Sequence, residues 1–279
     1  MTVIRRGPNG ARDARPRRDR RRKHWLWLYA ELLYILTWRD IKVRYKQSIM
    51  GVLWSILMPA LIVGAGLLLR VAITHLGGER LAAAEVATLS VKALPWAFFV
   101  SSLRFATVSL SSNANLLARS NVPRIVFPMS AVLGSLFDLL VATGPLVVIL
   151  ALCGVTPKVT LLWVPVLVAL LVLLVTGLGI LIAVGNVFLR DVKYIVEVIL
   201  TFAIFFTPVL YDVRMLGDVG TWLLLNPVTP LLEGLSAAVV RGESPPLAWL
   251  AYSAVVSVAI FGLAWAVFTR LDRVFADYL

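Results

Sequence analysis

Few residues of this 279-residue chain have the types and spacing that could do chemistry. A single cysteine, Cys153, permits no internal disulfide, and its surroundings suggest no metal cluster. The chain has no G-x-x-x-x-G-K-[ST] loop to cradle the phosphates of ATP, and no D-x-D or E-x-x-H motif. The sequence therefore predicts neither a catalytic centre nor a cofactor or metal in this chain, and it argues against a membrane glycosyltransferase.

Two charged residues stand out because they interrupt apolar segments. Arg104 and Asp138 each lie about ten to twelve residues into such a segment, and the two segments run in opposite directions, so both should reach the middle of a bilayer. A charge at that depth costs several kcal/mol unless it is paired or hydrated. We predict an ion pair between Arg104 and Asp138; the alternative is that either residue faces a water-filled path.

The composition predicts an integral membrane protein. Hydrophobic residues make up 60% of the chain, charged residues 15%, and the mean hydropathy is +0.88. Residues 159–189 contain no Asp, Glu, Lys or Arg, and a helix of that length exceeds the roughly 30 Å of a hydrocarbon core. We expect an all-α domain over residues 47–279. Its six spans are expected at about 51–69, 95–112, 126–152, 161–188, 194–211 and 248–269.

The distribution of basic residues predicts the orientation. Fourteen of the 27 Lys and Arg residues lie within residues 1–46, and residues 1–24 form a polar basic arm. Binding to anionic lipid headgroups explains such an arm better than binding to nucleic acid does. When the arm is counted with the loops on its side, the basic residues are concentrated on that side of the six spans, so both termini are expected in the cytoplasm.

Residues 25–46 are predicted to form an amphipathic interface helix rather than a seventh span. At 100° per residue, Tyr34, Trp38, Ile41 and Tyr45 share a narrow stripe, and basic residues form its flank. Such a helix lies in the plane of the membrane interface. It is either a plain anchor or a gate where a lipid-linked substrate enters. The candidate gate residues are Tyr34, Trp38, Arg39, Arg44 and Tyr45.

Two polar segments on the cytoplasmic side could serve a partner. In residues 113–124, Asn113 and Asn115 can cap a short helix that Pro123 would end, and a short polar turn is the alternative. Arg190 and Asp191, between the fourth and fifth spans, can cap a helix and follow the excess of basic residues expected on this side. The candidate coupling residues are Asn115, Arg119, Ser120, Asn121, Pro123, Arg190 and Asp191.

Aromatic side chains and a broken apolar segment mark the outer half. Residues 219–232 are too short to span and contain Asn226-Pro227 and Pro230, which predicts a re-entrant hairpin shielded by protein or by a water-filled cavity. Aromatic rings here can belong to an interfacial belt or can stack on sugar rings along a path. The candidate lining residues are Trp54, Phe98, Phe99, Phe202, Phe205, Phe206 and Tyr211.

Four stretches resemble a known family in the expected order. Residues 38–59, WRDIKVRYKQSIMGVLWSILMP, are similar to the N-terminal signature of ABC-2 type permeases that export polysaccharides such as O-antigen, capsule, teichoic acid and mycobacterial galactan. Met50 replaces a leucine of that signature. Residues 113–128 resemble the family's coupling-helix loop, residues 186–212 the region leading into the fifth span, and residues 226–245 the outer re-entrant helices. The resemblance implies that Arg190 and Asp191, in the second of these stretches, form a latch near the partner or the interface helix.

The resemblance implies a permease of an ATP-driven exporter in the bacterial plasma membrane. Two copies would form the pore for a lipid-linked polysaccharide, and two separate ATPase subunits would bind ATP and Mg²⁺ and dock on residues 113–124. The Ala-, Val- and Arg-rich composition is compatible with a high-GC actinobacterium, and a galactan is therefore a plausible polymer. A permease for a drug or a small lipid is the alternative, although such permeases lack the RDIKVRYKQS signature.

Overall fold

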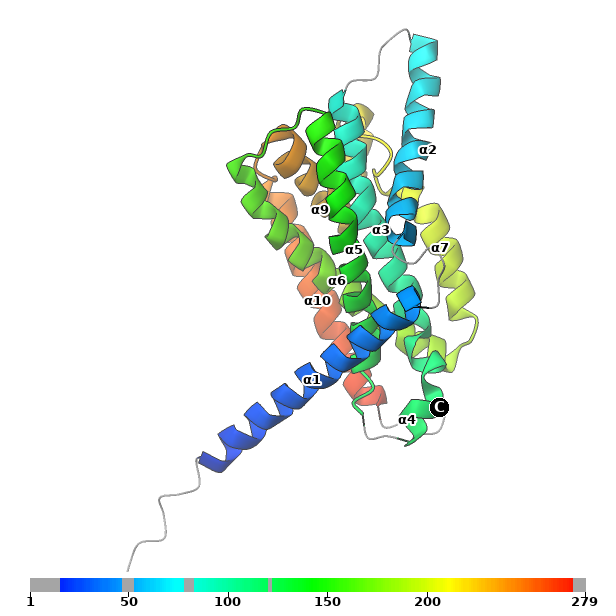
Figure 1. The fold of residues 1–279 in the computed structure, drawn as a ribbon, viewed down its shortest axis with the longest axis vertical. Coiled ribbons are helices and arrows are strands. Elements are labelled where there is room, and N and C mark those ends of the chain that lie inside the picture. The colour runs from blue at the N-terminus through cyan, green and yellow to red at the C-terminus, as the bar shows by residue number, and fades with distance from the viewer. Residues whose placement is uncertain (1–15, 47–52, 78–82, 120–121, 273–279) are drawn as a thin grey trace, which may run out of the picture.

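The computed structural model describes residues 16–46, 53–77, 83–119 and 122–272, and over these ranges the chain is helical and contains no strand (Figure 1). The longer helices are α1 (Pro16–Lys46), α2 (Leu53–Gly77), α3 (Ala83–Ser112), α5 (Val126–Leu152), α6 (Trp163–Phe188), α7 (Val192–Phe206) and α10 (Leu247–Leu271). The short ones are α4 (Ala114–Arg119), η1 (Val159–Leu162), η2 (Val213–Leu216), α8 (Asp218–Leu223), α9 (Val228–Ser236) and the π-helical turn η3 (Ala237–Arg241).

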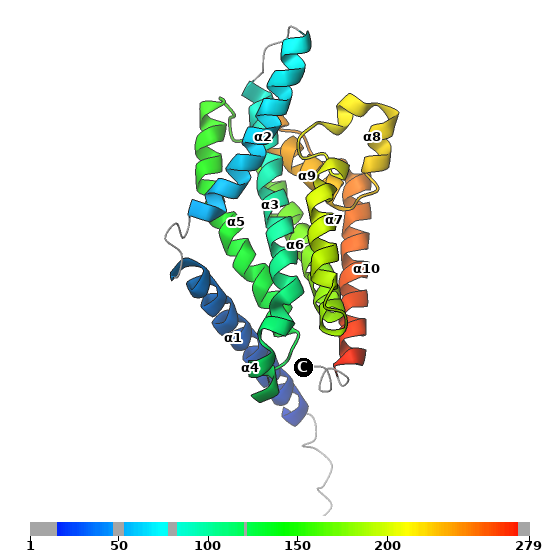
Figure 2. The same ribbon diagram turned by 90° about the vertical axis from the view of Figure 1, so that its right-hand side faces the viewer.

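The helices form a bundle with two ends. At the end that we name the α4 end, α3, α6 and α10 finish and α5 and α7 begin; α8 and α9 lie at the opposite end, named the α9 end (Figures 1 and 2). Helix α3 is central and packs against α2, α5, α6, α7 and α9. Helix α2 begins near the middle of the bundle and extends beyond the α9 end (Figure 1).

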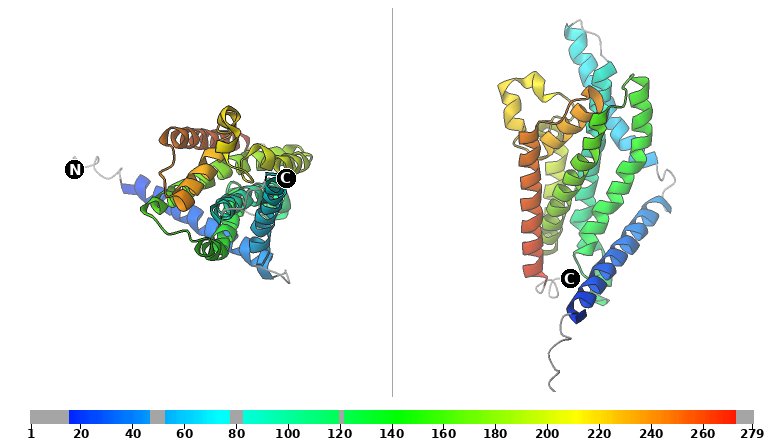
Figure 3. Two further views of the ribbon diagram at one scale, coloured as in Figure 1. Left: turned by 90° about the horizontal axis from the view of Figure 1, so that it is seen from above. Right: turned by 90° about the vertical axis from the view of Figure 1, so that its left-hand side faces the viewer.

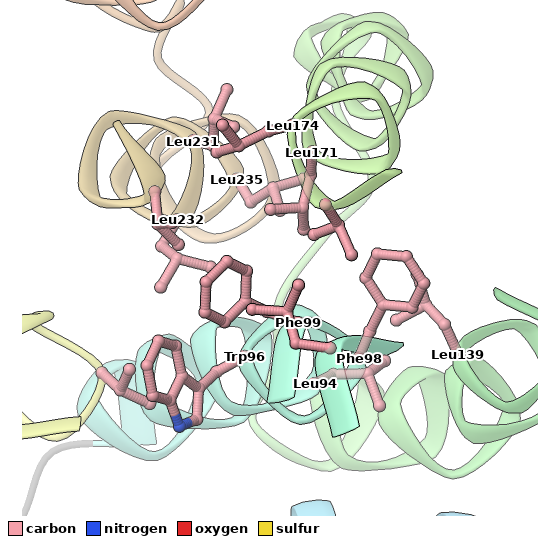
Figure 4. Packing of buried hydrophobic residues seen from close by; sticks show 14 of the residues in the cluster. Leu94, Trp96, Phe98, Phe99, Leu139, Leu171, Leu174, Leu231, Leu232 and Leu235 are labelled. Atoms are coloured by element: carbon pink, nitrogen blue, oxygen red, sulfur yellow. The ribbon is translucent and has the colours of Figure 1, made fainter. Parts of the chain in front are cut away.

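The main hydrophobic core lies between α3, α6 and α9. Leu171 and Leu174 of α6 and Leu231 of α9 are fully buried, and Phe98 of α3 is 2% exposed (Figure 4). All nine residues of α9 are buried, so this short helix is a part of the core rather than a surface loop. A segment too short to span can be buried in this way only because longer helices surround it.

Helices α6 and α10 approach each other closely at a glycine. A Cβ atom added at Gly177 would lie 2.9 Å from the backbone Cα and N of Phe261, a distance that real contacts do not show. Glycine therefore allows the two backbones to pack directly, as small residues do in membrane helix pairs.

The structure agrees with the predicted helical class and with four of the expected spans. Within the described residues, four helices are long and apolar enough to cross a membrane: Ala83–Ser112, Val126–Leu152, Val159–Phe188 and Leu247–Leu271. Helix α2 contains a shorter apolar stretch, Ile56–Leu68. Helix α1 begins at Pro16 rather than at residue 25, and α3 begins at Ala83 rather than at residue 95.

Candidate functional site

Helix α1 lies obliquely across the half of the bundle nearest the α4 end and packs on α5 (Figures 2 and 3). Its apolar contacts come from Leu36 and Ile41, which are 7% and 8% exposed. Tyr34 and Trp38 of the predicted aromatic stripe point away from the bundle, with 69% and 45% exposed. The helix thus buries one apolar line against protein and leaves aromatic rings for another surface.

The C-terminal turn of α1 is fastened to the middle of α5 by Asp138. Arg44 Nη1 donates to Asp138 Oδ2 at 2.7 Å, and the Tyr45 hydroxyl donates to Asp138 Oδ1. The Arg44 guanidinium also lies over the Phe105 ring, 3.7 Å from its centroid. Gly134, one turn before Asp138, leaves room for this guanidinium, because an added Cβ there would lie 3.2 Å from Arg44 Nη2.

A second polar contact lies little more than one turn earlier on α1. Arg39 Nη2 donates to the Asp40 carboxylate at 2.8 Å and to Asn113 Oδ1 at 3.0 Å. The other carboxylate oxygen of Asp40 accepts a hydrogen bond from Ser130 Oγ of α5 at 3.1 Å. Arg39 and Asp40 therefore join α1 both to α5 and to the junction between α3 and α4.

A cavity of about 560 Å³ opens beside the Arg44 contact. Its walls come from the end of α1 and from α2, α3, α5 and α7, and they are mainly apolar; Met58, Ile62, Phe98, Leu139 and Ile204 are examples. The polar groups of the lining include Arg44, Arg104, Asp138 and Thr201. A long apolar chain with a polar end fits this combination of surfaces.

The predicted ion pair between Arg104 and Asp138 is not the one that forms. Both residues line the cavity, but Arg104 Nη2 donates to Glu197 Oε1 of α7 at 2.5 Å, and Asp138 is bonded to α1. The pairing differs because α1 reaches the middle of α5 and because Glu197 lies one turn into α7. The side chains of Arg104 and Glu197 are 44% and 53% exposed, around a hollow that Thr107 and Lys193 also line.

The predicted lining residues divide into two groups. Phe98 borders the cavity, but Phe99 is a core residue whose ring stacks on Trp96, with centroids 5.3 Å apart. In contrast, the phenylalanines of α7 face outward. Phe202, Phe205 and Phe206 are 57%, 62% and 68% exposed. Tyr211 is partly buried and its hydroxyl donates to the Phe205 carbonyl at 2.7 Å. Trp54 belongs to α2, and its side chain lies outside the described part of the structure.

The predicted coupling segment contains the short helix α4, Ala114–Arg119. Asn113 begins it through its backbone carbonyl, which accepts from Leu116 N and Leu117 N at 3.0 Å. Asn115 is exposed. Ser120, Asn121 and the side chain of Arg119 lie outside the described residues, and Pro123 follows in a non-helical segment.

The second predicted coupling segment lies at the same end of the bundle. Arg190 and Asp191 are exposed between α6 and α7, and the Asp191 carbonyl accepts from Tyr194 N and Ile195 N at 3.0 and 3.1 Å. Asp191 thus begins α7 through its backbone, and a latch role for the two side chains stays a prediction.

A buried ionic network at the α9 end was not predicted. Lys92 Nζ is fully buried, bonded to Glu233 Oε1 of α9 and to the Tyr211 carbonyl at 3.2 Å. Arg241 lies 4.0 Å from the other Glu233 oxygen and 3.8 Å from Asp212. The sequence showed these residues only as loop charges, although the surplus of acidic over basic residues in that loop was a signal of pairing.

Comparisons with known proteins cover almost the whole chain. Residues 31–240 match the family described as ABC-2 type transporter. The chain is 27% identical over 265 residues to the O-antigen export system permease protein RfbA of Klebsiella pneumoniae. The aligned residues cover 92% of this chain and 98% of that protein. It is 29% identical over 256 residues to the O-antigen export system permease protein RfbA of Myxococcus xanthus, covering 90% and 96%.

Proposed function

This chain belongs to the ABC-2 type transporter family and is a membrane permease without an ATPase domain of its own, and we propose that it exports a lipid-linked polysaccharide. The substrate would resemble an O-antigen or a cell-wall galactan and would move from the cytoplasm across the bacterial plasma membrane. The observation that carries the proposal is the similarity to O-antigen export permeases, which extends over 90% or more of both chains rather than over a shared core alone.

The proposed topology has six spans, α2, α3, α5, α6, α7 and α10, with the α4 end in the cytoplasm. The basic residues at that end include Arg124, Arg190 and Arg270, as the positive-inside rule requires. Lys92 and Arg241 at the α9 end form ion pairs with Glu233 and Glu243, and the proposed orientation depends on the larger number of basic residues in the arm and at the α4 end. Both termini would then lie in the cytoplasm, with the residues before α1 on anionic lipid headgroups.

We propose that α8 and α9 form a re-entrant closure on the outer side. Irregular backbone is tolerated at membrane depth only where its polar groups have partners. The breaks around α9 meet this condition. Asn226 Nδ2 donates to Thr207 Oγ1 at 3.0 Å, Ser253 Oγ to the Pro227 carbonyl at 3.0 Å, and Tyr252 Oη to the Leu225 carbonyl at 2.7 Å.

Two copies are proposed to enclose the polysaccharide path between them. One bundle is packed around α3 and has a closed core, so a glycan needs space between chains. The exposed face of α7 suits this position, because it combines Phe202, Phe205 and Phe206 with the exposed Arg104–Glu197 pair. Phenylalanine rings can stack on sugars, whereas an exposed ion pair is costly against lipid.

Helix α4 is the proposed docking element for the ATPase. Two ATPase subunits, one for each permease copy, would bind ATP and Mg²⁺ and displace α4 when they close. Helix α1 is the proposed gate for the lipid-linked substrate, and the cavity beside Arg44 offers an apolar wall for the lipid part. A permease for a drug or small lipid would share α4, but it would not need a path long enough for a polymer.

Depletion of this protein in its native cells is the decisive experiment. We expect lipid-linked glycan to accumulate on the cytoplasmic side while surface glycan falls, measured by extraction of the lipid fraction and by labelling of intact cells. Re-expression of the unchanged chain should reverse both effects. Normal surface glycan after depletion would refute the proposal, and a changed drug sensitivity without glycan accumulation would favour the alternative.

A further inference from the structure

Helices α1 and α4 are far apart in the sequence but belong to one hydrophobic cluster at the α4 end. Leu36 of α1 and Leu117 of α4 are 7% and 6% exposed, and they share this cluster with Leu110 of α3 and Phe127 of α5. A displacement of α4 therefore disturbs the packing of α1. Packing alone does not fix a direction of movement, whereas a directional polar contact does.

Arg39 supplies that contact, and its side chain is held in a fixed orientation. Its Nε and Nη2 atoms donate to Asp40 Oδ1 at 3.1 and 2.8 Å, and Asp40 is itself fastened to Ser130 of α5. The remaining hydrogen bond of Arg39 Nη2 goes to Asn113 Oδ1 at 3.0 Å. Charged donors make the stronger hydrogen bonds, and an oriented guanidinium loses little freedom in making one.

Asn113 is bonded to three helices at once. Its Nδ2 donates to the Ser109 carbonyl at the end of α3 at 2.8 Å, and its own carbonyl accepts from the backbone N–H groups of Leu116 and Leu117 of α4. Its Oδ1 accepts from α1. Arg44, by comparison, joins α1 to α5. Within the described residues, the Arg39–Asn113 bond is thus a polar contact that connects α1 with the start of α4.

We propose that Arg39 and Asn113 are positioning residues that transmit the displacement of α4 to α1. This inference rests on the proposed function, because it requires a motor that acts on α4. When the ATPase subunits move α4, the Asn113 amide would carry Arg39 with it, so that the interface helix moves in step with nucleotide binding. Switching in proteins commonly uses such small shifts of packed helices.

The test measures both helices separately in the full complex. Cys153→Ser removes the native thiol, and spin labels are placed at Tyr34→Cys of α1 or Asn115→Cys of α4, each paired with Val255→Cys of α10, all at exposed positions. Distances are measured by pulsed electron paramagnetic resonance in lipid nanodiscs containing the permease and its ATPase, with and without ATP and vanadate. We expect both distances to shift with nucleotide in the otherwise unchanged chain.

In Arg39→Met and in Asn113→Leu, the shift at α4 should persist and the shift at α1 should fall by more than half. Export per ATP hydrolysed should fall at least fivefold, while ATP hydrolysis continues. The double variant should be no worse than either single one, because both remove the same contact. Lys42→Met is the matched control: it removes a charge from the same helix, but Lys42 lies over Trp38 of α1 itself.

Three outcomes would overturn the inference. An undiminished α1 shift in both single variants excludes transmission through this bond, and so does an α1 shift that is lost equally in Lys42→Met. A complex in which α4 moves and α1 does not, without any substitution, refutes the transmission alone. If α4 itself does not respond to nucleotide, the proposed ATP-driven function fails together with it. Should Asn113→Leu not fold, Arg39→Met gives the same decision by itself.

Discussion

Arg44 of α1 and Asp138 of α5 form a 2.7 Å ion pair in which the Tyr45 hydroxyl binds the second carboxylate oxygen. Their side chains are 19% and 20% exposed, so the pair is largely withdrawn from solvent. The contact fixes the C-terminal turn of a helix that is also held by one apolar line and by the polar contacts of Arg39 and Asp40. It also answers how an acidic residue can be retained in the middle of an apolar helix.

Asp138→Asn should lower the stability of the protein by about 2 kcal/mol, the typical loss for a hydrogen bond to a charged group. The guanidinium of Arg44 would keep its charge but lose its counter-ion in a partly buried site. The measurement is the thermal unfolding midpoint of the detergent-purified protein, together with protease cleavage at α1 as a sign of detachment.

The double variant Arg44→Leu with Asp138→Leu should recover part of this loss, because no unpaired charge remains. Combining Asp138→Asn with Arg104→Leu is the matched comparison and should bring no recovery, since Arg104 pairs with Glu197. Recovery by Arg104→Leu instead would show that the pairing described here is wrong.

The sequence predicts the apolar helices of this protein but not the partners of the charged residues within them. Hydropathy located the apolar parts of α3, α5, α6 and α10, because a helix in lipid needs only length and absence of charge. It also showed that Arg104 and Asp138 needed partners. It could not name the partners, because Arg44 was expected only as a candidate gate residue of an interface helix, and the oblique course of α1 along α5 is a tertiary property.

Lys92 illustrates the same limit at the other end. A lysine before an apolar run indicates a loop, and the second span was therefore expected to begin after it. In the structure Lys92 is fully buried within α3, because Glu233 from α9 neutralises it across 141 positions of sequence. The sequence alone does not reveal the acidic partner that allows Lys92 to be buried within a helix, so the lysine is expected to precede the span. By contrast, the length and prolines of residues 219–232 predicted a segment too short to span, and this segment contains parts of the short helices α8 and α9; its re-entrant course stays a proposal.

Lys92→Met should destabilise the protein by about 3 kcal/mol, since it leaves the Glu233 carboxylate without its closest partner in a buried site. Lys92→Met with Glu233→Leu should be closer to the unchanged protein than Lys92→Met alone. Lys193→Met is the control, because that lysine is exposed at the start of α7. Unfolding midpoints of all four proteins decide, and equal losses for Lys92→Met and Lys193→Met would contradict the buried pair.

Gly177→Ala should cost about 1–3 kcal/mol, because the added Cβ would press on the Phe261 backbone and push α6 and α10 apart. Gly262→Ala provides the contrast: it lies next to Phe261 in α10, but an added Cβ there meets nothing within 4 Å. Thermal unfolding should show a clear loss for the first variant and no loss for the second. Equal midpoints would mean that the two helices are not in backbone contact at this point.

The exposed face of α7 should be accessible to water in the assembled transporter. In a Cys153→Ser background, Phe202→Cys is compared with Val148→Cys of α5. The two positions are matched, because each lies four residues before the end of its helix and they are 57% and 59% exposed in the single chain. If α7 lines the polysaccharide path, a charged thiol reagent should modify Phe202→Cys at least tenfold faster than Val148→Cys, since lipid excludes the reagent and slows formation of the reactive thiolate. The rates are measured in membranes that contain the ATPase. Equally slow modification would assign this face to lipid or to a dry interface, and the path between two copies would then need other walls.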